Sequence, residues 1–464
     1  MPHSRATDPD PYLPDHGARG FVVDHYDLRL RYRVEPNRLE GVATLAVRAL
    51  EPLDQVRLDL AGLRVSRVEA DGRAVKYTQR GRALRVRPPR PLEPGGTVEL
   101  AVTYAGNPGP SRGTWGEVGW EELTAGVIVA GQPDGAPTWF PCNDHPGYKA
   151  TYDLTFSTDA PYTVVANAPV RRVTRRAGTR TWTFERTEPM CTYLATVQVG
   201  RYDVVALGAR GEVAREAEQA ADVTHDLDRH DELFEVFEGL FGPYPFAAYT
   251  VVVTPDDLEI PLEAHGASVF GANHLDGERG SDRLVAHELA HQWFGNSVSV
   301  RTWRDIWLNE GFACYAEWLW SEAGGGPTAD DLAREHHERL AALDQDLVLI
   351  DPTPALMFDD RVYKRGALTL HALRLTLGDD AFFGLVRTWT ERFRHGHAAT
   401  ADLRALVREA GGDTPGGGDD GGGATGSALD DLLDAWLERT ALPGLPPQPE
   451  APRPDLRERA ARRP

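Results

Sequence analysis

The sequence predicts an α+β protein, with a strand-rich N-terminal part and a C-terminal part that mixes helices and strands. Apolar residues alternate with polar ones over much of residues 20–205, as they do in half-buried strands. From residue 226 onward the apolar spacing becomes that of amphipathic helices. The length of 464 residues suggests about three domain-sized units. A hydrophobic fraction of 41% is enough for ordinary packed cores.

Residues 20–205 are expected to form a largely antiparallel β domain. Gly, Pro and Asp residues separate the alternating runs, as they do at the turns between strands. The clearest runs have their apolar residues at Tyr26, Leu28, Leu30, Tyr32 and Val34, at Val56, Leu58 and Leu60, and at Tyr152, Leu154 and Phe156.

Residues 206–445 are expected to form a second domain. An amphipathic helix over 233–241 should end at Gly242 and Pro243, which cannot continue it. The apolar run 249–253 is typical of a buried strand. Further helices are expected over 365–377, 380–394, 400–410 and 428–440.

Three segments are expected to lack regular structure. Residues 1–19 and 446–464 are predicted to be disordered tails, because they are polar and contain proline. Residues 411–426 contain nine glycines and are predicted to be a flexible loop.

Charge and cysteine content exclude several classes of protein. The chain has 70 acidic and 50 basic residues, a formal charge of −20, so we expect no nucleic-acid partner. Cys142, Cys191 and Cys314 are too few and too scattered for a disulfide framework, and buried free thiols are expected. The N-terminus lacks the apolar core of a signal peptide, and no run is long enough to span a membrane. These features favour a cytoplasmic protein with no membrane partner.

The run HELAH at residues 287–291 predicts a metal site. On a helix, His287 and His291 lie one turn apart on the same face, so both can bind one ion. Glu288 is rotated away from them and can hold a water instead. Glu310, from a second predicted helix over 305–320, completes a set of two histidines and one glutamate. Such a set leaves one position open on zinc, which is typical of a catalytic site.

The alternative is that these histidines are ordinary helix residues that match the motif by accident. The flanking residues argue against it. Ser281 and Asp282 are suited to begin a helix, and apolar residues surround the motif. Two apolar helices that both present metal ligands would be an improbable coincidence.

The sequence around the motif resembles the zinc aminopeptidases of the aminopeptidase N type, the family that includes leukotriene hydrolase. The runs HELAHQWFGN (287–296) and WLNEGFACYAEW (307–318) are similar to that family. So is FPCNDHP (140–146), where His145 replaces a glutamate of the family pattern. The resemblance covers residues 20–445 and continues in MCTYL (190–194), FGPYPF (241–246) and VYKRGA (362–367).

The resemblance implies a saddle-like β domain followed by a thermolysin-like catalytic domain of mixed α/β structure, with one Zn²⁺ per chain. Most members of the family continue into a long helical C-terminal domain that covers the active site. This sequence ends before that domain, so the resemblance implies a more open cleft or cover from another subunit.

Two further residues are assigned to the zinc site. The resemblance implies that Tyr363 donates a hydrogen bond to the oxyanion of the reaction, although a tyrosine at the start of a helix can also serve packing alone. Glu317 lies two helical turns beyond Glu310 on the same face and could accept a hydrogen bond from a ligand histidine. A solvated glutamate is the alternative for Glu317.

Recognition of a substrate's free amino group is assigned to Glu263 and Gln132. The resemblance aligns the run IPLEA (260–264) with a family loop whose glutamate binds the α-ammonium, but of that loop's main letters only Glu263 is present. It also places Gln132 where relatives carry a Gln or Glu that faces the same amine. A carboxylate beside a substrate cation is a direct charge complement. Residues 265–270 are expected to be an edge strand that pairs with the substrate main chain.

The leading hypothesis is a zinc aminopeptidase that acts on peptides with a free N-terminus, with Glu288 as the general base. One alternative is a zinc hydrolase of internal or non-peptide bonds. Another is a catalytically dead relative that only binds peptides. Dead relatives typically lose ligands or the base. This argues against the last alternative, because the sequence retains His287, Glu288, His291, Glu310 and Tyr363.

Overall fold

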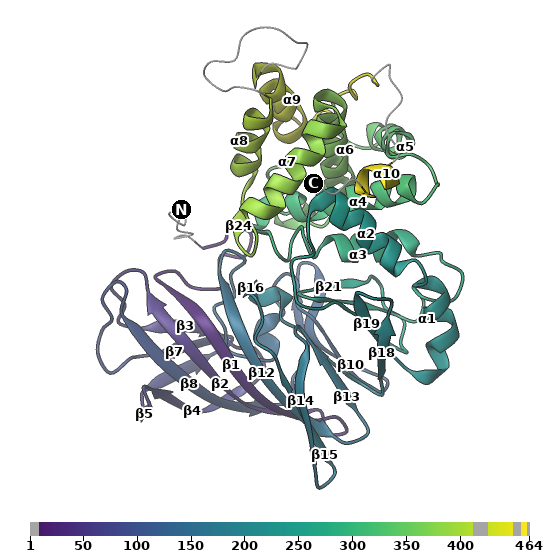
Figure 1. The fold of residues 1–464 in the computed structure, drawn as a ribbon. Helices are drawn as coiled ribbons and strands as arrows, with labels where there is room; N and C mark the ends of the chain where they lie inside the picture. The colour runs from purple at the N-terminus through teal and green to yellow at the C-terminus, as the bar shows by residue number, and fades with distance from the viewer. Residues whose placement is uncertain (1–8, 412–425, 449–455, 462–464) are drawn as a thin grey trace. The chain divides into compact units, whose positions relative to one another are not determined.

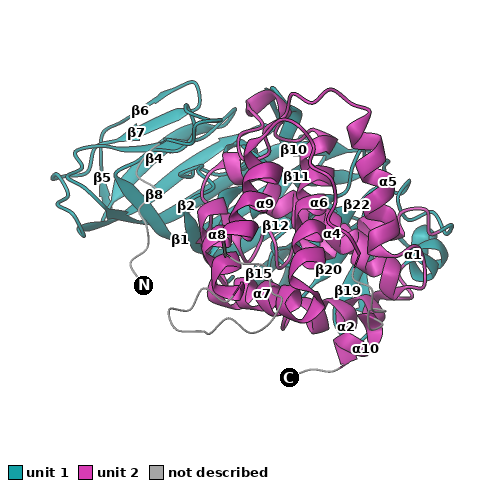
Figure 2. Cartoon of the chain, turned by 90° about the horizontal axis from the view of Figure 1, so that it is seen from above, with its two compact units in different colours: residues 1–226, 246–278 teal, residues 227–245, 279–464 magenta. Residues whose placement is uncertain are grey.

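The computed structural model describes residues 9–411, 426–448 and 456–461. The chain divides into two compact units, one formed by residues 1–226 with 246–278 and the other by residues 227–245 with 279–464 (Figure 2). The first unit contains most of the strands and the second most of the helices, so the α+β class predicted from the sequence is confirmed (Figure 1).

A nine-stranded sheet dominates the first unit. Its order is β14-β15-β12-β1-β2-β8-β4-β5, with β16 paired to β12. Every neighbouring pair is antiparallel except β1 and β12, which run parallel. The strands are β1 (Phe21–Arg33), β2 (Arg38–Ala49), β4 (Arg64–Ala70), β5 (Arg73–Ala74), β8 (Thr97–Gly106), β12 (Lys149–Asp159), β14 (Val170–Arg176), β15 (Thr179–Phe184) and β16 (Met190–Cys191).

Two smaller sheets complete the N-terminal β region. One has the order β3-β7-β6 and the other β13-β17-β11-β10-β9. Their strands are β3 (Val56–Asp59), β6 (Tyr77–Arg80), β7 (Ala83–Val86), β9 (Ser111–Gly113), β10 (Gly116–Leu123), β11 (Gly126–Ala130), β13 (Thr163–Ala166) and β17 (Val197–Gly200). Short 3₁₀ helices lie at Ala136–Thr138 and Thr192–Leu194.

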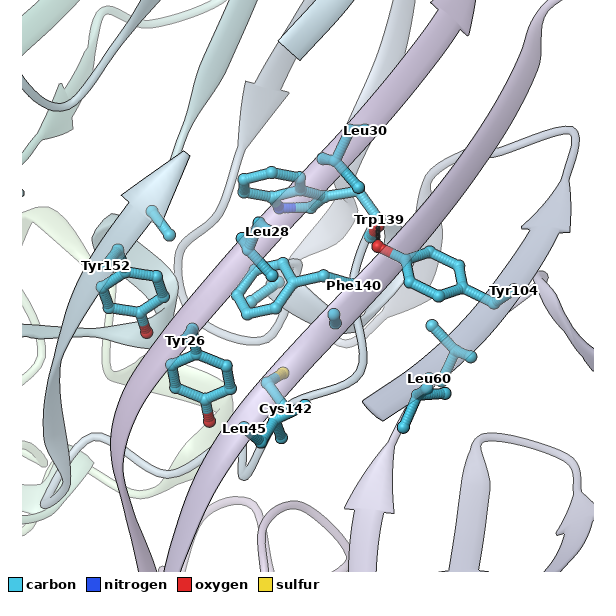
Figure 3. Packing of buried hydrophobic residues seen from close by; sticks show 14 of the residues in the cluster. Tyr26, Leu28, Leu30, Leu45, Leu60, Tyr104, Trp139, Phe140, Cys142 and Tyr152 are labelled. Carbon is cyan, nitrogen blue, oxygen red and sulfur yellow. Dashed lines mark hydrogen bonds between the residues drawn. The ribbon is translucent and has the colours of Figure 1, made fainter. Parts of the chain in front are cut away.

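The alternation predicted for the strands is confirmed by their burial. Tyr26, Leu28, Leu30 and Tyr32 of β1 are all buried, whereas Val34 lies just beyond the end of that strand. Aromatic and aliphatic side chains pack together in the core of this unit (Figure 3). Tyr26 stacks on Tyr152 with ring centroids 4.8 Å apart. The Tyr104 hydroxyl donates a 2.9 Å hydrogen bond to the main-chain oxygen of Trp139, so the phenol is satisfied although it is buried.

A mixed five-stranded sheet has the order β18-β19-β20-β22-β21. Residues 265–270 were predicted to form an edge strand, and that prediction is wrong. The strand β22 (Ala267–Phe270) lies between β20 and β21, and the edge is β21 (Leu262–Ala264), which carries Glu263. The remaining elements of this region are β18 (Asp203–Leu207), β19 (Gly211–Arg215), β20 (Thr250–Val253), a 3₁₀ turn (Ala217–Gln219) and α1 (Ala220–Asp226).

Residues 9–19, predicted to belong to a disordered tail, are packed against the rest of the first unit. Asp10 and Tyr12 are buried. The main-chain amide of Gly17 donates to Asp59 at 2.7 Å, and that of Ala18 donates to Asn143 at 2.7 Å. Buried acceptors on the β domain therefore hold a segment whose composition alone suggests disorder. Residues 1–8 lie outside the described residues.

The C-terminal segment also differs from its prediction. Leu456–Ala461 forms the short helix α10, in which Leu456 and Ala460 are buried, and Ala460 lies against Gly239 of α2. The predicted glycine-rich loop lies outside the described residues over 412–425, as do residues 449–455 and 462–464 of the predicted tail.

The second unit is mainly helical. The predicted helices are present, and α6 begins five residues earlier than predicted. The helices are α2 (His230–Phe241), α3 (Asp282–Ala290), α4 (Trp307–Ala323), α5 (Ala329–Ala341), α6 (Asp360–Leu377), α7 (Asp379–Arg392), α8 (Thr400–Ala410) and α9 (Gly426–Glu438), with 3₁₀ turns at Trp303–Asp305 and Pro354–Leu356. A parallel two-stranded ladder joins β23 (Ser299–Val300) to β24 (His397–Ala398).

The three cysteines are buried free thiols, as predicted. Among the residues that the structure describes, no helix combines the length and the apolar character that crossing a membrane requires.

Helices α4 and α6 cross at two glycines. A Cβ atom added to Gly366 would lie 2.8 Å from the Cα of Gly311, and one added to Gly311 would lie 2.9 Å from the Cα of Gly366. Glu310 precedes the first glycine, and Tyr363 lies one turn before the second. The spacing of these two side chains therefore depends on a close contact between main chains.

We expect Gly366→Ala to destabilise the protein. The new methyl group would overpack the crossing at a cost of about 1–3 kcal/mol, measured as a lower denaturation midpoint. Gly384→Ala in α7 is the matched control, because a Cβ there meets no atom within 4 Å. The control should be neutral or stabilising by about 0.5–1 kcal/mol. Equal shifts in the two variants would contradict a tight crossing.

Candidate metal centre

Helix α3 presents His287 and Glu288, and His291 lies directly at its C-terminal end. Ser281 occupies the N-cap position, as predicted, but its side chain makes no capping hydrogen bond. Asp282 in the first turn instead accepts a 3.0 Å hydrogen bond from the Trp320 indole of α4. This contact joins α3 to α4, the two helices that carry the metal-binding motif.

The side chains of His287, His291 and Glu310 converge in the second unit. The two Nε2 atoms lie 3.1 Å apart, and Glu310 Oε2 lies 3.6 Å from that of His287 and 3.4 Å from that of His291. All three residues are buried, and their potential ligand atoms lie within 4.8 Å of one another. One small cation could contact all three.

The opposite nitrogens of both imidazoles are already used. His291 Nδ1 lies 3.0 Å from the main-chain oxygen of Phe294, which can only accept, so Nδ1 carries a proton. His287 Nδ1 lies 2.8 Å from Glu317 Oε1, also an acceptor. In the neutral imidazoles both Nε2 lone pairs therefore point at each other and at Glu310. A cation between them removes the repulsion, and two nitrogens with one carboxylate are a donor set that suits zinc.

The pKa values of His287 and Glu310 also indicate that the cluster favours positive charge. Burial lowers the pKa of His287, but hydrogen bonds with Glu310 and Glu317 outweigh burial and raise it to about 10. Burial raises the pKa of Glu310, but His291 and His287 outweigh it and lower the value to about 2. The carboxylate is therefore held ionised beside the two imidazoles.

Glu288 is buried next to this cluster but differs from Glu310 in its partners. Burial raises the pKa of the Glu288 carboxyl above its usual value. Its Oε2 has no hydrogen-bond partner among the described residues, which is uncommon for a buried carboxylate. This atom is suited to bind a water that the metal would also hold.

Glu317 and Tyr363 both lie beside the imidazole ring of His287. Besides His287, Glu317 contacts Arg283, whose NH1 lies 3.3 Å from Glu317 Oε2. Burial raises the pKa of Glu317, but the His287 hydrogen bond outweighs it and lowers the value. Tyr363, in the first turn of α6, is half-buried, and its ring lies nearly parallel to that of His287 with centroids 6.1 Å apart.

Gln132 and Glu263 belong to the first unit. Gln132 is half-buried, and its Nε2 has no hydrogen-bond partner among the residues described. Glu263 lies on the edge strand β21, opposite Ser268 of β22, and is also half-buried. Neither side chain is fully exposed, as a purely solvating residue would be.

Sequence reasoning missed two contacts at the cluster. The Phe294 oxygen is a main-chain acceptor, which every residue type has, so the sequence does not indicate its role. Arg283 lies one turn before His287, so its position on the helix face was a usable signal.

Comparison with known proteins agrees with this geometry. Residues 225–436 match the peptidase family M1 domain, and residues 22–194 match the peptidase M1 N-terminal domain. The crystal structure of an M1 zinc metallopeptidase from Deinococcus radiodurans superposes with a TM-score of 0.84 at 33% identity, covering 95% of this chain and 99% of that one. A mutant M1 zinc metallopeptidase from Deinococcus radiodurans, bound to a Tyr-Ser-Ala substrate, superposes with a TM-score of 0.82 at 33% identity, covering 94% of this chain and 99% of that one.

Curated relatives are longer. Tricorn protease-interacting factor F2 of Thermoplasma volcanium is 27% identical over 67% of this chain and 40% of that protein. Aminopeptidase N of Lactococcus lactis is 29% identical over 66% of this chain and 38% of that protein. The chain thus spans about two fifths of the length of these relatives. The chain belongs to peptidase family M1, with zinc as the metal of its structural relatives.

We expect Glu317→Gln to weaken zinc binding about 10- to 100-fold, because an amide orients and polarises His287 less than a carboxylate does. Competition with a chromophoric chelator measures the affinity. Glu338→Gln, at an exposed position of α5, is the matched control and should leave the affinity unchanged. An affinity that does not respond to Glu317→Gln would mean that Glu317 does not support the ligand.

Proposed function

We propose that this chain is a zinc-dependent aminopeptidase that removes N-terminal residues from peptides. The observation that carries the proposal is the convergence of His287, His291 and Glu310 beside the unpaired carboxylate oxygen of Glu288. Zinc held by the first three residues would polarise the scissile carbonyl and lower the pKa of a bound water. The remaining chemistry belongs to the side chains.

Glu288 is assigned the role of general base. It takes a proton from the attacking water and afterwards delivers it to the leaving amine nitrogen. Burial raises the pKa of its carboxyl, which makes Glu288 a stronger base than an exposed glutamate.

Tyr363 is assigned the stabilisation of negative charge on the carbonyl oxygen. Its position in the first turn of α6, beside His287, supports this role. A phenol that is fixed before the reaction interacts more strongly with the transition state than with the substrate. Packing at the helix start is the competing role, and it would leave turnover independent of the hydroxyl.

Glu263 and Gln132 are assigned the recognition of the substrate's α-ammonium group. A carboxylate and an amide oxygen both accept hydrogen bonds from a cationic amine. The relatives named as aminopeptidases, and the neighbouring structure with a Tyr-Ser-Ala substrate, support peptides with a free N-terminus as the substrate class. The three buried thiols are consistent with the cytoplasm as the location of the protein.

Blocking the substrate's amine tests this function. We expect the chain to hydrolyse fluorogenic aminoacyl amides, to lose that activity with a chelator and to regain it with zinc. The N-acetylated forms of the same amides should be refused, because they lack the ammonium group. Hydrolysis of acetylated or internal bonds at comparable rates would favour the broader zinc hydrolase. Absence of all turnover in zinc-loaded protein would favour a relative that only binds peptides.

Glu288→Gln should keep zinc and lose turnover. The amide preserves the shape of the side chain but cannot accept the proton, so kcat should fall at least about a hundredfold. Elemental analysis and steady-state kinetics on the same sample separate the two properties. Substantial residual activity with normal zinc content would contradict the assignment of Glu288 as the base.

A further inference from the structure

A groove of about 930 Å³ lies within the first unit and has no part in the proposed chemistry. It is lined by the hairpin of β14 and β15, by the hairpin of β18 and β19, and by short segments around residues 161–164 and 247–249. Figure 1 labels the strands of both hairpins, β14, β15, β18 and β19. We call it the arginine groove, after Arg175, Arg180, Arg201 and Arg210 in its lining.

The charge of the groove opposes that of the chain. Its lining holds four arginines and only two carboxylates, Asp203 and Glu212, although the chain carries a net charge of −20. Arg175 of β14 is directly opposite Arg180 of β15 in the strand register. Like charges directly opposite each other on neighbouring strands are destabilising. An anionic occupant would relieve this repulsion.

The two arginines that lie opposite each other, Arg175 and Arg180, are not neutralised by carboxylates of the described residues. The Arg180 guanidinium stacks over Trp182 at 4.8 Å, and its Nε is buried without a hydrogen-bond partner in the described parts of the chain. Arg201 lies over the Tyr162 ring at 5.6 Å. Stacking fixes the guanidinium planes of Arg180 and Arg201. One N–H of Arg180 donates to the main-chain oxygen of Tyr162 at 3.3 Å, and other N–H donors remain for a further acceptor.

The groove also exposes apolar surface. Six large hydrophobic side chains are exposed among the described residues, and Val170, Val173 and Val204 of these line the groove. An irregularity in the register between Val170 and Arg172 brings Val170 and Val173 to the same lining although they are three residues apart. Single exposed valines need no explanation, but three in one concave, basic surface indicate a binding site.

Two open sheet edges flank the groove. β14 is the terminal strand of the nine-stranded sheet, and β18 is the terminal strand of the mixed sheet, within the described residues. All seven residues of β14 are exposed. Edge strands offer main-chain donors and acceptors to an extended polypeptide, with specificity from alternate side chains.

We propose that the arginine groove binds an acidic, extended polypeptide segment of a partner protein along β14. Carboxylates of the segment pair with Arg175 and Arg180, and its apolar side chains cover Val170 and Val173. Alternate residues of an extended chain face the same side, so one face of the segment carries both kinds of side chain. Nucleic acid is less suited, because its phosphates would meet the arginines but leave the valines without an apolar partner.

The test uses the whole chain and a capped nine-residue peptide. Valine and glutamate alternate at the odd positions of this peptide, and threonine fills the even positions. Acetylation and amidation of its ends keep it from being an aminopeptidase substrate. Fluorescence anisotropy at physiological salt should show saturable binding. The same peptide with lysine in place of glutamate, and a single-stranded oligonucleotide of similar charge, should not bind.

Two charge reversals on the same strand locate the site. Arg175→Glu should weaken binding at least about tenfold, because it places an anion where the segment's carboxylate would pair. Arg172→Glu is the matched control, since its register partner is Thr183 rather than a groove arginine and it is absent from the lining. It should weaken binding less than about threefold, because its side chain lies on the face of β14 opposite to that of Arg175.

Both variants should turn over an aminoacyl amide at the same rate as the unchanged chain. This measurement also checks that the variants are folded. The proposal is overturned if the unchanged chain shows no saturable binding, if the two variants are affected equally, or if the lysine peptide or the oligonucleotide binds as well. None of these outcomes depends on whether the chain is an aminopeptidase.

Discussion

The convergence of two imidazole nitrogens and one carboxylate in a buried site is the constraint on which the rest of the site depends. His287 Nε2 and His291 Nε2 lie 3.1 Å apart, and Glu310 is held beside them. Burying such groups without compensating charge is costly, because the interior replaces little of the solvation that they lose. A divalent cation satisfies all three at once, and its binding free energy then contributes to the stability of the folded state.

Hydrogen bonds and helix packing fix the orientation of each metal-binding side chain. The main-chain oxygen of Phe294 and the carboxylate of Glu317 hold the outer nitrogens of the two imidazoles, so neither ring can rotate without losing a hydrogen bond. The main-chain contact between Gly311 and Gly366 holds α4 against α6. This packing positions Glu310 and Tyr363, which lie next to the crossing. Two packed helices hold side chains more rigidly than a loop does.

The motif and the strand alternation could be predicted from the sequence because each is a local pattern with a fixed geometric period. The spacing of His287 and His291 is one helical turn, and the burial of β1 follows its period of two. Other features depend on distant residues. The strand β21 has three residues, too few to show a period, so the sequence does not reveal that β21 rather than β22 is the edge. Residues 9–19 are ordered by Asp59 and Asn143, which no local composition reveals.

The metal content of the native protein tests the central claim most directly. Elemental analysis of chain purified without chelators or denaturants should find about one zinc per chain, as an open site with two histidines and one glutamate requires. Dialysis against a chelator should remove the zinc, and reconstitution should restore it. A native sample with no near-stoichiometric metal, and no uptake when zinc is supplied, would contradict the account.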